Sequence, residues 1–174
     1  MAVIARFSPA VGFAILLLTV TVTDANLRYL RTVAFSAQRT QRVLPTTPEQ
    51  AIGLYNRVVR PDANHFDEDS GVFTAPIKGV YALAFTFHEA LDASDPASYI
   101  KLVRESSDGG SETDVVATES SPPPASGSSI SVPGASVMLE LEKGDKMYLA
   151  TTDAIDAEVS QPISFSGYLL TRIV

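Results

Sequence analysis

The side chains that most often carry chemistry in proteins are sparse in this chain of 174 residues. It contains no cysteine, which excludes a thiol nucleophile, cysteine metal sites and a disulfide framework. Its two histidines, His65 and His88, fall in different predicted elements and lack the spacing of a zinc or catalytic pair. The sequence also has no nucleophile elbow and no phosphate-binding glycine loop. These observations argue against an enzyme.

Acidic residues are the remaining candidates for chemistry, as ligands for calcium. The run Asp67-Glu68-Asp69-Ser70-Gly71 resembles half of a calcium loop, but it lacks the ligand order of an EF-hand, and we interpret it as a hairpin turn. Other candidates lie in predicted loops or near predicted strand ends: Asp92, Asp95, Asp114, Asp153 and Asp156. Calcium requires several oxygens at one point, which sequence spacing does not establish. We therefore expect no cofactor and a solvated acidic rim, with calcium as the alternative.

The charge of the chain limits its partners. The formal net charge is -7, and the sequence pI is near 4.7. Nucleic acids and anionic membrane surfaces attract basic proteins, and the sequence has no basic run. We expect neither partner.

The N-terminal segment predicts export. Arg6 precedes an apolar run over 11–22, and Thr23-Asp24-Ala25 has small residues at the positions that a signal peptidase reads. The run is shorter than the roughly 20 apolar residues of a spanning helix, so removal of residues 1–25 is preferred over a retained anchor. Residues 26–31 then form a short spacer without collagen or heptad repeats. The mature protein is expected to be secreted and not to insert into a membrane.

The stretch 73–87 has the alternation of a strand, and both of its faces are apolar. After a turn at Lys78-Gly79, one face carries large residues and the other small ones. The large residues are Tyr81, Leu83, Phe85 and Phe87, and the small ones are Val80, Ala82, Ala84 and Thr86. A half-solvated sheet would show a polar face. Either a second chain covers one face, or the strand is buried inside one subunit, and periodicity leaves both possibilities open.

Further strands are predicted at 98–105, 113–119, 128–132, 136–142, 146–152 and 163–173. Gly144-Asp145 predicts a tight turn in which the aspartate accepts backbone hydrogen bonds, and Gly167 within a strand indicates a bulge or a close neighbour. In the last strand Phe165 faces one side and Tyr168 the other, which again indicates a covered second face and hence a trimer. The loops around 92–96, 106–112 and 151–162 are the predicted ligand-binding segments.

Four blocks of this sequence resemble the globular head of complement protein C1q. The central one is the spacing Phe73-x5-Gly79-x-Tyr81-x-Leu83-x-Phe85, preceded by Tyr55, Pro61 and Phe66. Tyr55, Pro61 and Leu83 depart from the residues that the family usually has there. The other blocks are Val33 to Ala37, Leu139 to Leu149 with its Gly144-Asp145, and Ser164 to Leu170. Together they identify residues 32–174 as a C1q-like globular domain.

The resemblance implies an all-β, ten-stranded jelly-roll sandwich that assembles as a homotrimer, or as a heterotrimer with related heads. It implies a recognition module for carbohydrate, microbial-surface or protein ligands, with a pattern-recognition or lectin-like role in innate immunity. The alternative is a signalling ligand, similar to tumour necrosis factor, that binds a cell-surface receptor. Some members bind calcium through loop aspartates. Here Ser131 to Gly134 stand where one such ligand is expected, and Asp114 matches another loosely.

Overall fold

The described part of the chain consists of β-strands and their connections. The computed structural model describes residues 33–40, 49–59, 65–92, 99–109, 112–119, 128–151 and 162–173. The predicted signal peptide and spacer lie outside these residues. The strands are β1 (Ala34–Arg39), β2 (Arg57–Val59), β3 (Phe66–Asp67), β4 (Val72–Thr74), β5 (Gly79–Phe87), β6 (Glu89–Asp92), β7 (Tyr99–Glu105), β8 (Glu112–Glu119), β9 (Ser128–Ser131), β10 (Gly134–Leu141), β11 (Lys146–Thr151) and β12 (Ile163–Arg172).

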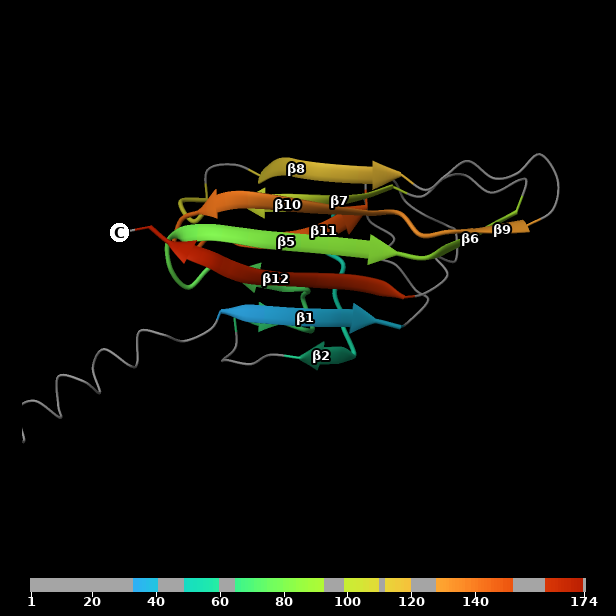
Figure 1. The fold of residues 1–174 in the computed structure, drawn as a ribbon, viewed down its shortest axis with the longest axis horizontal. Coiled ribbons are helices and arrows are strands. Elements are labelled where there is room, and N and C mark those ends of the chain that lie inside the picture. The colour runs from blue at the N-terminus through green and yellow to red at the C-terminus, as the bar shows by residue number, and fades with distance from the viewer. Residues whose placement is uncertain are drawn as a thin grey trace, which may run out of the picture. The chain divides into compact units, whose positions relative to one another are not determined.

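These strands form two antiparallel five-stranded sheets and a two-stranded ribbon (Figure 1). Sheet A has the order β10-β5-β12-β1-β2, and sheet B has the order β3-β4-β11-β7-β8. The ribbon pairs β6 with β9. The predicted jelly-roll sandwich is thus confirmed, and the ribbon adds two strands to its ten. Among the described residues no helix is long and apolar enough to cross a membrane.

The alternation of β5 fits its position as an interior strand of sheet A, between β10 and β12. Tyr81, Leu83, Phe85 and Phe87 are at most 2% exposed and point toward sheet B. Their neighbours along the strand point away from sheet B and are only partly covered. Hydrogen-bonded pairing with β10 on one side and β12 on the other satisfies the backbone of β5. The large residues are therefore buried within the subunit, and the small ones form its surface.

The core between the sheets is aromatic, and Phe35 of β1 lies at its centre. Its ring stacks on Phe66 at 4.6 Å and on Phe73 at 5.0 Å, and it meets the edge of Phe165 at 5.0 Å. Such stacked and edge-to-face pairs add to the stabilisation from burying the rings. Most of these rings belong to the blocks that carry the C1q resemblance, so that pattern describes the core of the sandwich.

Gly144 directs the chain from sheet A to sheet B. The predicted turn is present, with Gly144 at a φ of 95°, a backbone conformation that favours glycine. The strands that it joins are not paired with each other, because β10 belongs to sheet A and β11 to sheet B. Hydrogen bonds between this turn and Ala75 hold it against the chain that enters β5. Spacing alone predicts the turn but does not distinguish a hairpin from a sheet-to-sheet connection.

The acidic run at 67–71 is a hairpin turn, as predicted. It joins β3 to β4, which pair in antiparallel register. The Asp67 carboxylate accepts a hydrogen bond from the amide of Asp69 at 3.0 Å, and Gly71 has a φ of 75°. Asp67 therefore caps its own turn.

Candidate interaction face

The outer face of sheet A, the side turned away from sheet B, is the candidate functional surface. β5 contributes Val80, Ala82, Ala84 and Thr86 to it. The register places Met138 of β10 and Tyr168 of β12 on either side of Ala82. Met138 is 72% exposed and Tyr168 is 52% exposed. A row of large, exposed apolar side chains thus flanks a strand whose own side chains are small.

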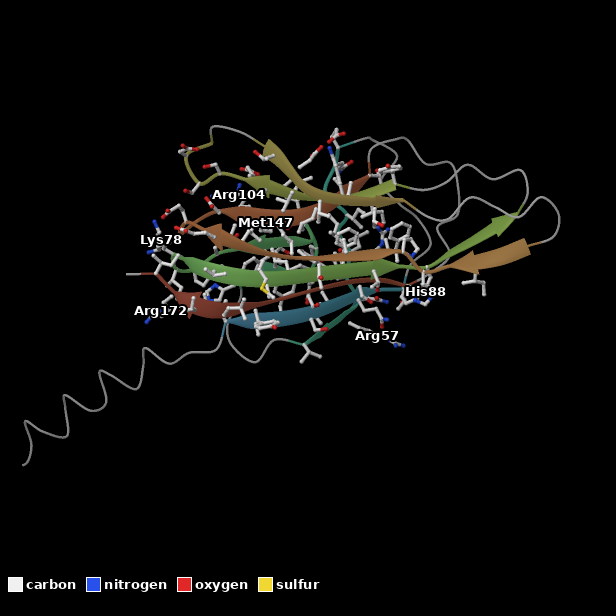
Figure 2. All side chains as sticks on the ribbon, turned by 45° about the horizontal axis from the view of Figure 1, so that its top comes forward. Arg57, Lys78, His88, Arg104, Met147 and Arg172 are labelled. Atoms are coloured by element: carbon white, nitrogen blue, oxygen red, sulfur yellow. The ribbon has the colours of Figure 1, made fainter. Side chains whose placement is uncertain are left out.

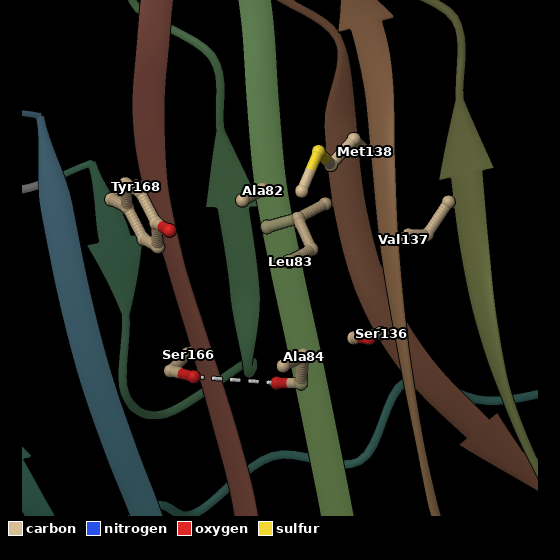
Figure 3. Close-up of a pocket in the computed structure, with 8 residues that line it drawn as sticks. All are labelled: Ala82, Leu83, Ala84, Ser136, Val137, Met138, Ser166 and Tyr168. Atoms are coloured by element: carbon tan, nitrogen blue, oxygen red, sulfur yellow. Dashed lines mark hydrogen bonds between the residues drawn. The ribbon is translucent and has the colours of Figure 1, made fainter.

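This difference in size creates a pit of about 300 Å³ in the outer face. Met138 and Tyr168 form its two sides (Figure 3). Its floor consists of small side chains, namely Ala82, Ala84, Ser136 and Ser166. The Ser166 hydroxyl donates a hydrogen bond to the carbonyl of Ala84 at 3.5 Å, which leaves the floor with little unsatisfied polarity. Such a pit suits an apolar side chain better than a charged group.

The pit has none of the groups that covalent or acid–base catalysis requires. Ser136 and Ser166 line it without a histidine or carboxylate beside them in the lining. His65 and His88, the histidines of the chain, are not among the lining residues. The arrangement supports docking rather than reaction.

Charged residues gather at the end of the sandwich where β12 ends. Lys78 forms ion pairs with Glu140 at 3.3 Å and with Glu142 at 2.6 Å. These side chains are about half exposed, so their contribution to stability is small. Figure 2 places Lys78 and Arg172 at this end and His88 at the other.

The predicted trimer or core candidates divide between the two faces of sheet A. Tyr81, Leu83, Phe85, Phe87 and Phe165 are core residues, and the hydroxyl of Tyr81 donates to the carbonyl of Ile77 at 2.7 Å. Tyr168 alone of this set lies on the outer face. The core thus covers the large residues of β5, and the small residues lie on the outer face of sheet A.

The three glycines singled out by the sequence have different surroundings. Gly79 is the first residue of β5 and follows a bend, and a Cβ there would lie 2.5 Å from the carbonyl oxygen of Thr171. Gly144 forms the turn between the sheets. Gly167 lies opposite both Phe35 and Leu83 in the register, and a Cβ would come within 2.7 Å of the Phe35 ring. The irregularity in β12 falls just beyond Gly167, between Leu169 and Thr171.

Of the calcium candidates, Asp114 is engaged by a lysine. Lys101, only 7% exposed, pairs with Asp114 at 2.9 Å and also with Glu49. Burial lowers the pKa of Lys101, but these two carboxylates outweigh burial and raise the pKa overall. The ammonium group of Lys101 contacts one oxygen of the Asp114 carboxylate, whose side chain is largely exposed.

The side chains of the other candidates lie outside the described part of the structure. Asp95, Asp153 and Asp156 lie outside the described residues, and only the backbone of Asp92, at the end of β6, is described. No group of three or more acidic or histidine side chains suited to a metal occurs in the described ranges. The described residues therefore do not bring together the several oxygens that a calcium site requires.

Asp145 is a buried carboxylate with several donors, as the turn prediction expected. Its side chain is fully buried, and it accepts hydrogen bonds from the amides of Glu142 at 2.9 Å and Ser107 at 3.0 Å. Arg104 Nε donates to it at 3.0 Å. Burial raises the pKa of Asp145, but the two amides and the guanidinium outweigh burial and hold the pKa below its ordinary value. Asp145 is a structural group that joins β7, β11 and the turn.

The predicted ligand-binding loops begin at opposite ends of the sandwich (Figure 1). Ser106 and Ser107 follow β7 and lie beside Asp145, at the end where the chain terminates. The segments after β6 and after β11 leave from the other end, because β11 runs antiparallel to β7. The described ends of these segments therefore lie at two different ends of the sandwich.

A second hollow of about 410 Å³ opens between the edges of the two sheets. It is lined by Arg104, Ser106, Thr113, Val115 and Leu139. Its one guanidinium is already paired with Asp145. This groove is mixed in polarity and has no group poised for chemistry.

Met138 lies on the candidate face but was not among the residues that the sequence singled out. In the run Ser136 to Glu142, the odd positions are apolar and the even positions are polar except for Met138. An apolar residue on the polar face of a strand is the signal that could have identified it. The burial of Lys101 had no comparable signal, since a lone lysine in an apolar strand usually reaches solvent.

Comparison with known proteins supports the same architecture. The model of the C1q domain matches residues 34–170. The structure of the globular domain of zebrafish complement 1qA protein superposes with a TM-score of 0.59 and 24% sequence identity, covering 82% of this chain and 100% of that domain. At this identity the superposition shows the fold. No curated protein matches the chain.

Proposed function

The chain belongs to the C1q-domain family, and from this premise we propose that it is a secreted, trimeric recognition module that binds its ligands without catalysis. C1q domains are generally non-enzymatic, are typically secreted, and commonly form trimers and bind ligands. The proposed role is pattern recognition or lectin-like binding in innate immunity. Its partners are copies of itself or related heads, together with carbohydrate, microbial-surface or protein ligands.

The observation that carries the proposal is the outer face of sheet A. Exposed apolar side chains on soluble monomers usually occur singly, whereas Met138 and Tyr168 here flank an apolar pit. Leu170, 45% exposed, follows Tyr168 on β12. Burying this surface against a neighbouring subunit removes it from water, which is the main source of association free energy. A closed ring of three copies buries the same face in every subunit.

Replacement of Met138 tests the trimer. In the single subunit Met138 is 72% exposed, so Met138→Asp should leave the fold intact. In an interface the same change places a charge against apolar surface, and we expect dissociation to monomers. Light scattering on the full chain, expressed and purified at micromolar concentration, gives the mass, and circular dichroism reports the β-structure.

Leu54→Asp is the matched control. Leu54 is also largely exposed, at 53%, but it lies in the segment before β2 and has a φ of 61°, which Asp tolerates at least as well as Leu. This variant should remain a trimer. A monomeric wild-type protein, or a trimeric Met138→Asp variant, would contradict the proposed assembly.

Ligand recognition requires a separate measurement. The trimer would be screened on glycan arrays, on microbial surfaces and on cells that present candidate receptors. Binding to glycans or microbes supports the recognition role. Binding only to a cell-surface receptor, abolished by changes in the clefts between subunits, would favour the alternative of a signalling ligand similar to tumour necrosis factor.

A further inference from the structure

We propose that the ribbon of β6 and β9 is an arm with which each subunit contacts its neighbours, through Ile130 and Val132. The proposal rests on the trimer proposed above and extends the contact beyond the sandwich. In Figure 1 the ribbon continues past the end of the two sheets, and His88 marks the place where it leaves them in Figure 2.

The ribbon continues β5 and β10 without a change of register. Thr86 lies opposite Gly134 at the end of one ladder, and Glu89 lies opposite Ser131 at the start of the next. Two residues separate these pairs on each strand, so neither strand carries an inserted residue. The amide of Phe87 donates to the carbonyl of Pro133 at 3.0 Å and bridges the gap. Because side chains alternate along a strand, those on the outer side of β10 continue on the same side of β9.

This alternation produces an exposed stripe along one side of β9 and β10, in which Gly134 and Ser136 separate the apolar residues of the ribbon from Met138. Ile130 is 77% exposed and Val132 is 54% exposed, and both share the side of Met138. The register places the backbone of Ala90 opposite Ile130. The stripe thus joins the outer face of sheet A to the arm.

Two physical arguments indicate that the stripe is covered in the assembled protein. A two-stranded ribbon alone in water is marginally stable, and in the described residues β6 and β9 pair only with each other. Exposed aliphatic side chains on such a ribbon add no stabilisation until another surface covers them. The partner is a second copy of this chain, because the stripe is continuous with the face through which the subunits are proposed to meet. In a ring of identical subunits, a stripe that extends this face also turns toward the neighbours.

Cysteine accessibility tests the arm directly. The chain has no cysteine, so Ile130→Cys supplies a single thiol whose reaction with an aqueous thiol reagent can be followed. We expect this thiol to react about tenfold more slowly in the trimer than when Met138→Asp is added to dissociate it. Leu54→Cys is the control, and its thiol should react at the same rate with and without Met138→Asp. All variants are made in the full chain.

The outcomes separate the arm from the trimer. Slow reaction at position 130 in a trimer, with fast reaction at position 54, supports the arm. If the Ile130→Cys protein is a stable trimer but its thiol reacts as fast as the thiol of the dissociated double variant with Met138→Asp, the arm proposal is wrong. The trimer proposal is not affected by that result. A monomeric wild-type protein overturns both proposals.

The strength of association provides a second measurement. Ile130→Thr combined with Val132→Thr keeps β-branched residues in the ribbon and removes aliphatic surface. We expect the trimer to dissociate at a protein concentration about tenfold higher than for wild type in a dilution series followed by light scattering. An unchanged dissociation curve would show that these side chains do not contribute to the contact.

Discussion

At the scale of single residues, Asp145 shows how one buried polar group can hold several segments together. Its carboxylate receives the amide of Glu142 in its own turn, and the amide of Ser107 and the guanidinium of Arg104 from the end of β7. A buried carboxylate is stable only when such donors replace water. Removing the carboxylate leaves these donors without an acceptor, which lowers the free energy of unfolding.

We expect Asp145→Ala to lower the free energy of unfolding by about 2–4 kcal/mol at pH 7. Urea melts give this value. The matched control is Glu105→Gln, which removes a carboxylate paired with Lys146 at 2.7 Å near the surface, where the change should be below about 1 kcal/mol. If the two variants lose the same free energy of unfolding, the buried carboxylate of Asp145 stabilises the fold no more than the surface ion pair does.

The depressed pKa of Asp145 also predicts an acid dependence. A carboxyl group whose pKa is lower in the folded state binds fewer protons there than in the unfolded state. Its stabilising contribution is present above the ordinary carboxyl pKa of about 4 and is lost as the pH falls below that value. Acidification from pH 6 to pH 3 should therefore destabilise wild type more than Asp145→Asn. Parallel stability curves for the two proteins would contradict this assignment.

At the scale of elements, Gly167 determines how closely β1, β12 and β5 pack against the core. The register places Gly167 between Phe35 and Leu83, the large residues of the strands on either side. Their side chains occupy the volume that a side chain at position 167 would need. The glycine is needed here for space rather than for its backbone angles, in contrast to Gly144.

Gly167→Val should lower the free energy of unfolding by roughly 1–3 kcal/mol, because a well-packed core resists added volume. A double-mutant cycle of Gly167→Ala with Phe35→Leu tests the cause. The smaller side chain at position 35 should offset part of the cost, with a coupling above about 0.5 kcal/mol. If the free-energy changes of the two single variants add up to that of the double variant in urea melts, crowding against Phe35 is not the cause of the destabilisation. Gly109→Ala, where a Cβ meets no atom within 4 Å, measures backbone strain without crowding.

At the scale of the whole molecule, the outer face of sheet A is only partly covered by the described part of the chain. Sheet B and the core protect the large side of β5, and the small side remains as the floor of the pit between Met138 and Tyr168. A flat, uncharged floor of alanine and serine lets another chain approach closely. The proposed trimer and arm assign this surface and its extension to a single assembly.

If folding and assembly are coupled, the thermal midpoint will depend on concentration. A trimer is favoured by mass action, so raising the protein concentration a hundredfold should raise the midpoint of the wild-type protein by several degrees. The midpoint of the monomeric Met138→Asp variant should not change. Scanning calorimetry or fluorimetry over this range gives both values. A wild-type midpoint independent of concentration would mean that the subunit is stable without its neighbours.

The sequence by itself determined which residues of a strand share a face, because alternation along a strand and the spacing of aromatic residues depend on local chain geometry. The strand at 80–87 and the turns at 67–71 and at Gly144 followed from local signals, and the jelly-roll class followed from the resemblance to the C1q head. Only the tertiary structure decided what lies across from each strand, since pairing and sheet membership depend on residues far apart in the chain. In the structure β10 and β11 belong to different sheets, and the predicted loops begin at two different ends of the sandwich. Lys101 forms an ion pair with Asp114. The tertiary structure also turned the small face of β5 outward, where the neighbouring strands place Met138 and Tyr168 beside it.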